Sequence, residues 1–142
     1  MLYTAVFMLV AVAAYIAISS FQRSEVPLQQ NILAKEMGQG FAAAVTLAVK
    51  GGTGFSYNYS FPKTVFTIPY SMDFTRIDSN VIVLDWPGPY GNFSYQYDVP
   101  AYHYAVQNNG GCLSGSVLRS NECSNMLMFH NENGILTIRQ LG

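Results

Sequence analysis

The chain has 142 residues, a formal net charge of −1, 50% hydrophobic residues and only 11% charged residues. A chain of this length supports one small domain beside a hydrophobic segment. Because the few charges have both signs and form no basic patch, the composition excludes a protein built to bind nucleic acid.

The chain opens on an apolar run, Met1 to Gln22, that carries no charged side chain. A helix of about 20 residues crosses the ~30 Å hydrocarbon core of a bilayer. A cleaved secretory signal would have a basic start and an apolar stretch of only about 7–15 residues, and this run has neither. A plain membrane anchor remains open, as does a helix that sits in the membrane first and later packs against copies of itself.

Small residues are frequent in this apolar run. They are Ala5, Ala11, Ala13, Ala14, Ala17, Ser19 and Ser20. Small side chains let helix backbones approach closely, and a lone anchor does not need them. We therefore predict that the run packs against sister helices. The predicted helix–helix assembly residues are Leu2, Val6, Leu9, Val10, Ala13, Ala17 and Phe21.

A polar segment containing Pro27 follows the run. Proline lacks a backbone donor and crowds the preceding turn, so we expect a kink at Pro27 rather than the end of the helix. Beyond it, apolar residues recur every four positions between polar ones, which is typical of an amphipathic helix. The residues predicted to pack this helix against the rest of the chain are Leu33, Met37, Phe41 and Val45.

Gly38 and Gly40 interrupt the helical pattern, and each costs about 1 kcal/mol relative to alanine in a helix. We interpret them as a flexible point or as a place where another helix packs closely. The glycines between positions 51 and 54 end the helix. The helix would then occupy residues 1–50, roughly 75 Å at 1.5 Å per residue, and its second half would protrude from a membrane.

From Phe55 the polarity alternates with a period of two, which predicts a strand with one aromatic face. Further strands are predicted at 63–69, 74–77, 81–84, 93–97 and 102–106, with a closing hairpin at 126–130 and 135–140. Loops are predicted at 87–92 and 108–111. Short strands without intervening helices predict that residues 51–142 form a small β-sandwich head, so the fold class is α+β with an all-β head.

The chain has two cysteines, Cys112 and Cys123. A disulfide suits a surface domain with a small core, and two buried free thiols are the alternative. Neither His103 nor His130 adds a cluster with metal-ligand spacing, so we expect no metal. Asn58 and Asn92 each begin an N-x-Ser triplet and are candidates for N-glycosylation.

The sequence contains no nucleophile elbow, no phosphate-binding loop and no dinucleotide glycine pattern. Its aspartates lack the dense spacing of a calcium loop. We therefore expect neither an enzyme nor a bound cofactor. The tyrosine-rich stretch from Gly88 to Val106 is interpreted as core and cross-strand packing, with a sticky outer surface as the alternative.

The predicted layout is a charge-free N-terminal helix with an amphipathic continuation and a β-rich head, with TAVFMLVAVAAYIAISSF at the start and GILTIRQLG as the terminal strand. In this layout and in these residues, the chain resembles the archaeal branch of the type IV pilin-like superfamily. This branch includes archaeal pilins, archaellins and archaellum accessory proteins with immunoglobulin-like heads. The start, Met1 to Val6, lacks the carboxylate that bacterial type IV pilins carry there. The family is made with a short basic leader that a dedicated peptidase removes, and this sequence shows none. Either the numbering begins at the mature terminus, or the chain is not processed in this way.

The resemblance implies a structural subunit of an extracellular cell-surface filament that serves adhesion or motility. The subunit would be stored in the membrane as a precursor and then polymerise with identical copies. An assembly ATPase and a platform protein would be its further partners. The alternative is a membrane-anchored surface-binding or stator-like module that does not polymerise.

Overall fold

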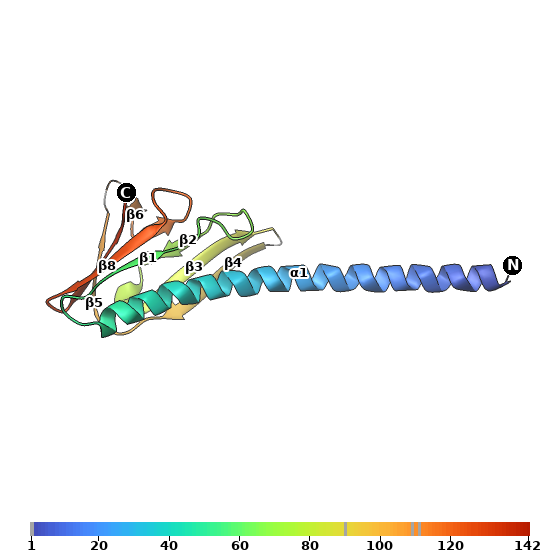
Figure 1. Cartoon of the computed structure of the whole chain (residues 1–142), viewed down its shortest axis with the longest axis horizontal. Helices are drawn as coiled ribbons and strands as arrows, with labels where there is room; N and C mark the ends of the chain where they lie inside the picture. The colour runs from blue at the N-terminus through green and yellow to red at the C-terminus, as the bar shows by residue number, and fades with distance from the viewer. Residues whose placement is uncertain (1, 90, 109, 111) are drawn as a thin grey trace.

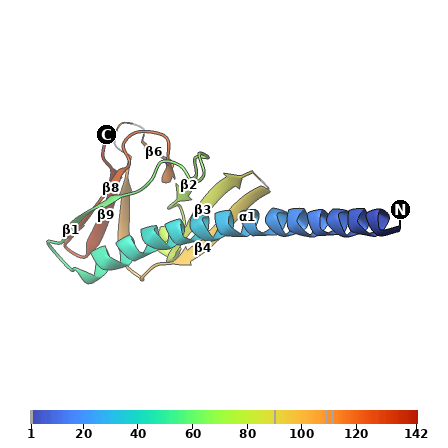
Figure 2. The same cartoon turned by 45° about the vertical axis from the view of Figure 1, so that its right-hand side comes forward.

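The computed structural model describes residues 2–89, 91–108, 110 and 112–142, and within them it leaves the side chains of residues 2, 3 and 19–28 undescribed. Helix α1 (Leu2–Lys50) is 49 residues long and enters a head of short strands (Figure 1). Its N-terminal part projects well away from the head (Figure 2).

The described strands form two sheets. Sheet one has the order β1 (Ser56–Ser60), β8 (Met126–Glu132), β9 (Ile135–Gln140) and β5 (His103–Gln107). Sheet two has the order β4 (Gly91–Asp98), β3 (Val81–Gly88), β2 (Ser71–Asp73), β7 (Val117–Arg119) and β6 (Leu113–Ser114). The pairs are antiparallel except for β5 with β9, which is parallel.

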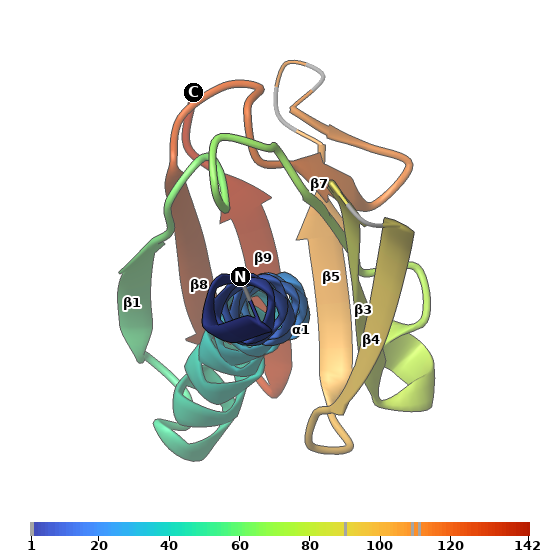
Figure 3. The same ribbon diagram turned by 90° about the vertical axis from the view of Figure 1, so that its right-hand side faces the viewer.

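The inner faces of the two sheets share one hydrophobic core, as a sandwich requires. The C-terminal half of α1 lies between the sheets on the open side of this sandwich (Figure 3). It contacts β1 and β8 of sheet one and β3 and β4 of sheet two. The helix is therefore a component of the head's core and closes the gap between the sheets.

The closing hairpin is confirmed, with β8 paired antiparallel to β9. The two residues between these strands, Asn133 and Gly134, have φ angles of 51° and 77°. Two successive left-handed residues are typical of the type I′ turn, which matches the twist of the strands it joins. The predicted turn at 108–111 includes positions 109 and 111, which lie outside the described residues.

Three predictions about local structure are wrong. Residues 63–69 do not form a strand, because Phe66 and Thr67 adopt φ angles of 48° and 64° and close a tight turn between Val65 and Ile68. The segment 74–77 is a turn leading into the 3-10 helix η1 (Ile77–Ser79), and the strand lies before it in β2. The loop predicted at 87–92 is shorter, because β3 continues to Gly88 and β4 starts at Gly91.

Candidate functional site

The N-terminal part of α1 exposes apolar side chains on all sides. Every residue from Thr4 to Ile18 is exposed, and the large apolar side chains among them are 56–76% exposed. Successive residues such as Val6, Phe7 and Met8 are turned by about 100° from one another, so the apolar surface encircles the helix. A helix that is apolar on all sides requires lipid or other helices around it.

The predicted assembly residues Val6, Leu9, Val10, Ala13 and Ala17 all lie on this exposed part of the helix. Leu2 and Phe21 also belong to α1, but their side chains are outside the described set. The helix continues through Pro27 without a break. The side chain of that proline is likewise undescribed, so the kink at Pro27 stays a prediction.

By length and hydropathy, one described helical segment could cross a membrane, Gln29–Lys50, and Thr4–Ile18 is a shorter apolar segment. One third of the residues in the most apolar part of the longer segment are buried within the protein. This segment is also the part of α1 that fills the gap between the sheets, so its entry into lipid would expose the head's core. Thr4–Ile18 is therefore the better-placed apolar surface for lipid or for other helices.

The seat of α1 on the head is a stripe of buried residues on one face. They are Ala34, Phe41, Ala44, Val45 and Ala48, each at most 4% exposed. Of the predicted contacts, Phe41 and Val45 are fully buried and Met37 is partly buried against the core. The prediction for Leu33 is wrong, because this side chain is 46% exposed and Ala34 is buried instead. A strict four-residue repeat drifts around a helix with 3.6 residues per turn, whereas the buried positions 34, 38, 41, 45 and 48 alternate steps of four and three.

The helical glycines face tyrosines of the head. A Cβ atom at Gly38 would collide with the Tyr97 ring, and one at Gly40 would meet the Tyr59 hydroxyl. The Tyr97 hydroxyl donates to the Lys35 carbonyl oxygen at 2.7 Å. The predicted close approach at these glycines is therefore real, but the neighbour is the head rather than another helix.

Burial of the Tyr97 phenol, with a smaller effect of neighbouring Tyr95, raises its pKa to about 12. The Tyr95 hydroxyl donates to Asn31 Oδ1, and burial raises the pKa of Tyr95 as well. Both phenols therefore stay protonated at physiological pH and act as donors to α1. Together these two hydrogen bonds fix the point where the helix leaves the head.

Asn131 on β8 contacts the C-terminal end of α1, and it is fully buried. Its Nδ2 donates to the Ala48 carbonyl oxygen at 3.1 Å, and its Oδ1 accepts from the Tyr102 hydroxyl at 2.9 Å. The bond satisfies one of the carbonyls that lack an intrahelical partner at a helix C-terminus. The hairpin predicted at 126–130 and 135–140 leaves Asn131 in the turn between its strands, whereas β8 continues to Glu132. The alternation of Leu127 and Phe129 would have placed Asn131 on the inner face.

Replacing Gly38 with alanine should loosen this seat. The new methyl group must displace the Tyr97 ring, and overpacking of this kind costs about 1–3 kcal/mol, which outweighs the ~1 kcal/mol gain in helix propensity. Urea unfolding should therefore show a lower midpoint for Gly38→Ala. Gln39→Ala, at the adjacent exposed position, is the control and should leave the midpoint unchanged. An increase in stability for Gly38→Ala would contradict the tyrosine contact.

Cys112 and Cys123 form a disulfide, with an S–S distance of 2.03 Å and a Cα–Cα distance of 5.9 Å. The bond ties the start of β6 to the loop that follows β7. Closing a loop of this size stabilises a domain by about 2–3 kcal/mol in the chain-entropy model. A double Cys112→Ser, Cys123→Ser variant should lose this amount in urea unfolding at equal pH. An unchanged unfolding free energy would show that the head does not depend on the bond.

The two candidate glycosylation sites lie on edge strands. Asn58 is exposed on β1, on the face opposite Tyr57 and Tyr59. Asn92 is exposed on β4, where it pairs with Pro87, and so lies in a strand rather than in the predicted loop. Both side chains are sterically accessible to a modifying enzyme.

The described residues contain no group of three or more histidine, cysteine, aspartate or glutamate side chains arranged to hold a metal ion. Comparison of the chain with protein-family models, with curated proteins and with solved structures gives no match.

Proposed function

We propose that this protein is a structural subunit, a pilin, of an archaeal type IV-like cell-surface filament that serves adhesion or motility. It polymerises through its N-terminal helix, and its β-sandwich head, immunoglobulin-like in the resemblance, forms the outer surface of the filament. The membrane holds the subunit before assembly. An assembly ATPase and a platform protein, as the resemblance implies, extract and add it.

The observation that carries this proposal is the division of α1 into two halves. The second half packs against the head, which buries Phe41 and Val45 completely. The first half leaves side chains such as Leu9 and Val10 at 72% and 62% exposure. Each buried square ångström of such apolar surface contributes about 25 cal/mol, so this half strongly favours an apolar environment.

The small residues in the exposed half support sister helices as that environment after assembly. Ala13 and Ala17 let helix backbones approach closely, which lipid tails do not require. A contact in which different surfaces of two copies meet need not close on itself and generates an open helical polymer. The head stays outside such a polymer, because its own core is already complete.

Shearing of producing cells tests the proposal. Filaments should be released by shear, be visible by electron microscopy and contain this chain as their main protein by peptide mass analysis. A chain that remains wholly with the membranes after shearing, with no filaments in the released fraction, would instead support the non-polymerising anchored module.

A further inference from the structure

The outer face of sheet one carries an arginine without an acidic partner. Arg139 on β9 lies in register between Met128 on β8 and Gln107 on β5. Its Nη2 contacts the Met128 sulfur at 3.5 Å, and its Nε is shielded from solvent without a hydrogen-bond partner. Among the described side chains, no carboxylate lies within ion-pair distance of this guanidinium.

One described carboxylate shares this face with Arg139, that of Glu132, and it lies at the end of β8, four residues along the strand from Met128. Glu132 pairs with His130 at 3.4 Å, and His103 is exposed on β5. Met126 and Met128 add half-buried, adaptable apolar surface beside the arginine. The outer face of sheet one is thus a half-apolar surface with one unsatisfied cation.

The outer face of sheet two carries the opposite charge. Asp73, Asp85 and Asp98 all lie on it, since they alternate with the buried residues of β2, β3 and β4. None of the three forms an ion pair with a described lysine or arginine. The nearby cation on this face, Arg119, is paired with Glu122 at 3.2 Å.

A depression of about 310 Å³ lies in this acidic face. It is lined by Ser71, Asp85, Trp86, Pro87, Asn92, Phe93 and Ser94. Asp85 Oδ1 accepts a hydrogen bond from the Ser94 hydroxyl at 2.6 Å, which leaves Oδ2 without a hydrogen-bond partner among the described residues. A carboxylate flanked by hydroxyl and amide groups is well suited to a guanidinium, which donates several hydrogen bonds from one plane.

We propose that the outer face of sheet one docks on the outer face of sheet two of the next copy, with Arg139 entering the depression at Asp85. The two faces point away from each other, because the inner faces of both sheets share one core. A single chain therefore cannot satisfy the contact, but a second copy can. The inference rests on the proposed filament and names the surfaces through which its heads meet.

The contact is heterologous, because each copy uses one face toward the copy before it and the other face toward the copy after it. Such a contact propagates and does not stop at a dimer. The paired charges would also fix the register and the direction of addition, since like-charged faces repel.

Charge exchange tests this contact in cells that produce the full chain. Arg139→Glu or Asp85→Arg alone should lower the amount of sheared filament roughly tenfold or more, since either change leaves like charges facing each other. The double variant Arg139→Glu with Asp85→Arg restores the pair in reversed orientation and should restore the filaments. Arg76→Glu and Asp78→Arg, at exposed positions before and within η1, are the matched controls and should have no effect.

Equal amounts of chain in the membranes and unchanged thermal unfolding of the purified variants show that each variant folds. If both single variants yield as much sheared filament as the wild type, or if the double variant does not restore the yield, the proposed head contact is wrong. The proposed filament is not affected by either result. If the wild type itself gives no filament, the proposed function fails and the contact fails with it. A glycan found on Asn92 in sheared filaments would fill the depression and would likewise contradict the contact.

Discussion

Replacing Phe41 with alanine is expected to lower the free energy of unfolding by about 3–5 kcal/mol, the usual cost of removing a buried phenylalanine. Phe41 is fully buried, and its ring lies 5.1 Å from Tyr59, 5.4 Å from Phe61 and 6.2 Å from Tyr70 between ring centroids. These rings come from β1 and from the segments that follow it, so the substitution should release α1 from the head. Urea unfolding of the purified full chain measures the loss.

Leu47→Ala is the matched control for this substitution. Leu47 lies on the same helix but is 47% exposed, so its truncation leaves little cavity. Its effect should stay within about 0.5–1 kcal/mol. Equal losses for Phe41→Ala and Leu47→Ala would contradict the seat of the helix between the two sheets.

Enlarging a small residue in the exposed half of α1 should separate assembly from membrane insertion. Ala13→Leu adds apolar volume, which lipid accepts and which slightly favours insertion. The same change obstructs close packing of helices, where overpacking costs about 1–3 kcal/mol, or roughly 5- to 150-fold in an equilibrium constant. We expect an unchanged membrane fraction and a loss of sheared filaments of at least about fivefold.

Val12→Leu is the control, because Val12 is not among the predicted assembly residues and the change in size is small. It should leave both the membrane fraction and the filament fraction as in the wild type. Filament yields for Ala13→Leu equal to those of the wild type would show that the small residues serve no close packing. A fall in both fractions would show that insertion is affected and not assembly.

The long helix and its change to strands at Phe55 were readable from the sequence, because hydrophobic periods of 3.6 and two are properties of local sequence. The closing hairpin was readable for the same reason, since Asn133 and Gly134 favour one turn type. The disulfide between Cys112 and Cys123 was one of two open possibilities. Composition and domain size favoured it, and the structure contains it.

The errors arose where a distant contact decides the conformation. The segment 63–69 has strand-forming residues but folds into a tight turn. Ser120, which is distant in sequence, holds both ends of this segment: its hydroxyl accepts a hydrogen bond from the Tyr70 backbone N–H and donates one to the Lys63 carbonyl oxygen. Leu33, which was predicted to pack, is exposed and Ala34 is buried instead, because the position of the head decides which face of the helix is buried. The parallel pairing of β5 with β9 is not visible in either strand alone.

The components of the candidate site were readable in part. The exposed apolar run follows from composition, and its predicted assembly residues remain a prediction. The tyrosine contacts at Gly38 and Gly40 needed the position of β4 and β1. Arg139 is an ordinary residue of a terminal strand in the sequence. Its lack of an acidic partner emerges only when β8, β9 and β5 are placed side by side.

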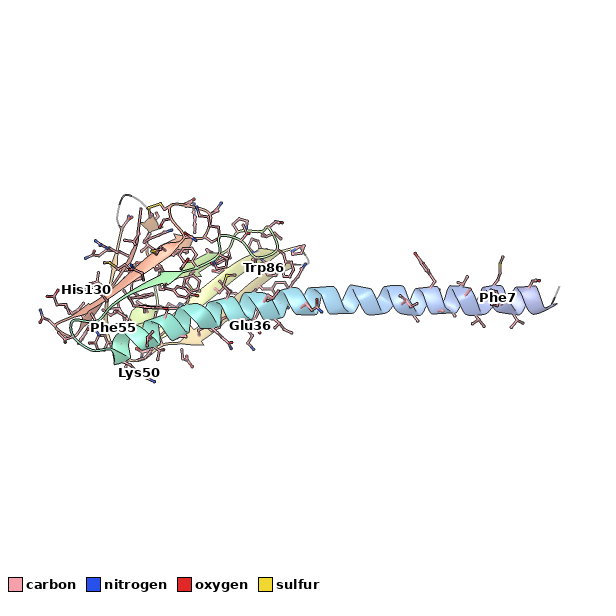
Figure 4. The ribbon with its side chains drawn as sticks, viewed as in Figure 1. Phe7, Glu36, Lys50, Phe55, Trp86 and His130 are labelled. Atoms are coloured by element: carbon pink, nitrogen blue, oxygen red, sulfur yellow. A yellow bond between two sulfur atoms is a disulfide. The ribbon has the colours of Figure 1, made fainter. Side chains whose placement is uncertain are left out.

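In the proposed filament, the apolar first half of α1 leaves the lipid and packs against sister helices. The large apolar side chains between Thr4 and Ile18, including Phe7 in Figure 4, are exposed on the part of the helix that projects beyond the head. Reconstruction of the sheared filaments by cryo-electron microscopy tests this directly. We expect a central bundle of helices, with the predicted assembly residues Val6, Leu9, Val10, Ala13 and Ala17 of each copy packed on its neighbours and the heads outside. A chain recovered only as lipid-embedded monomers, or a filament with no helices at its axis, would contradict it.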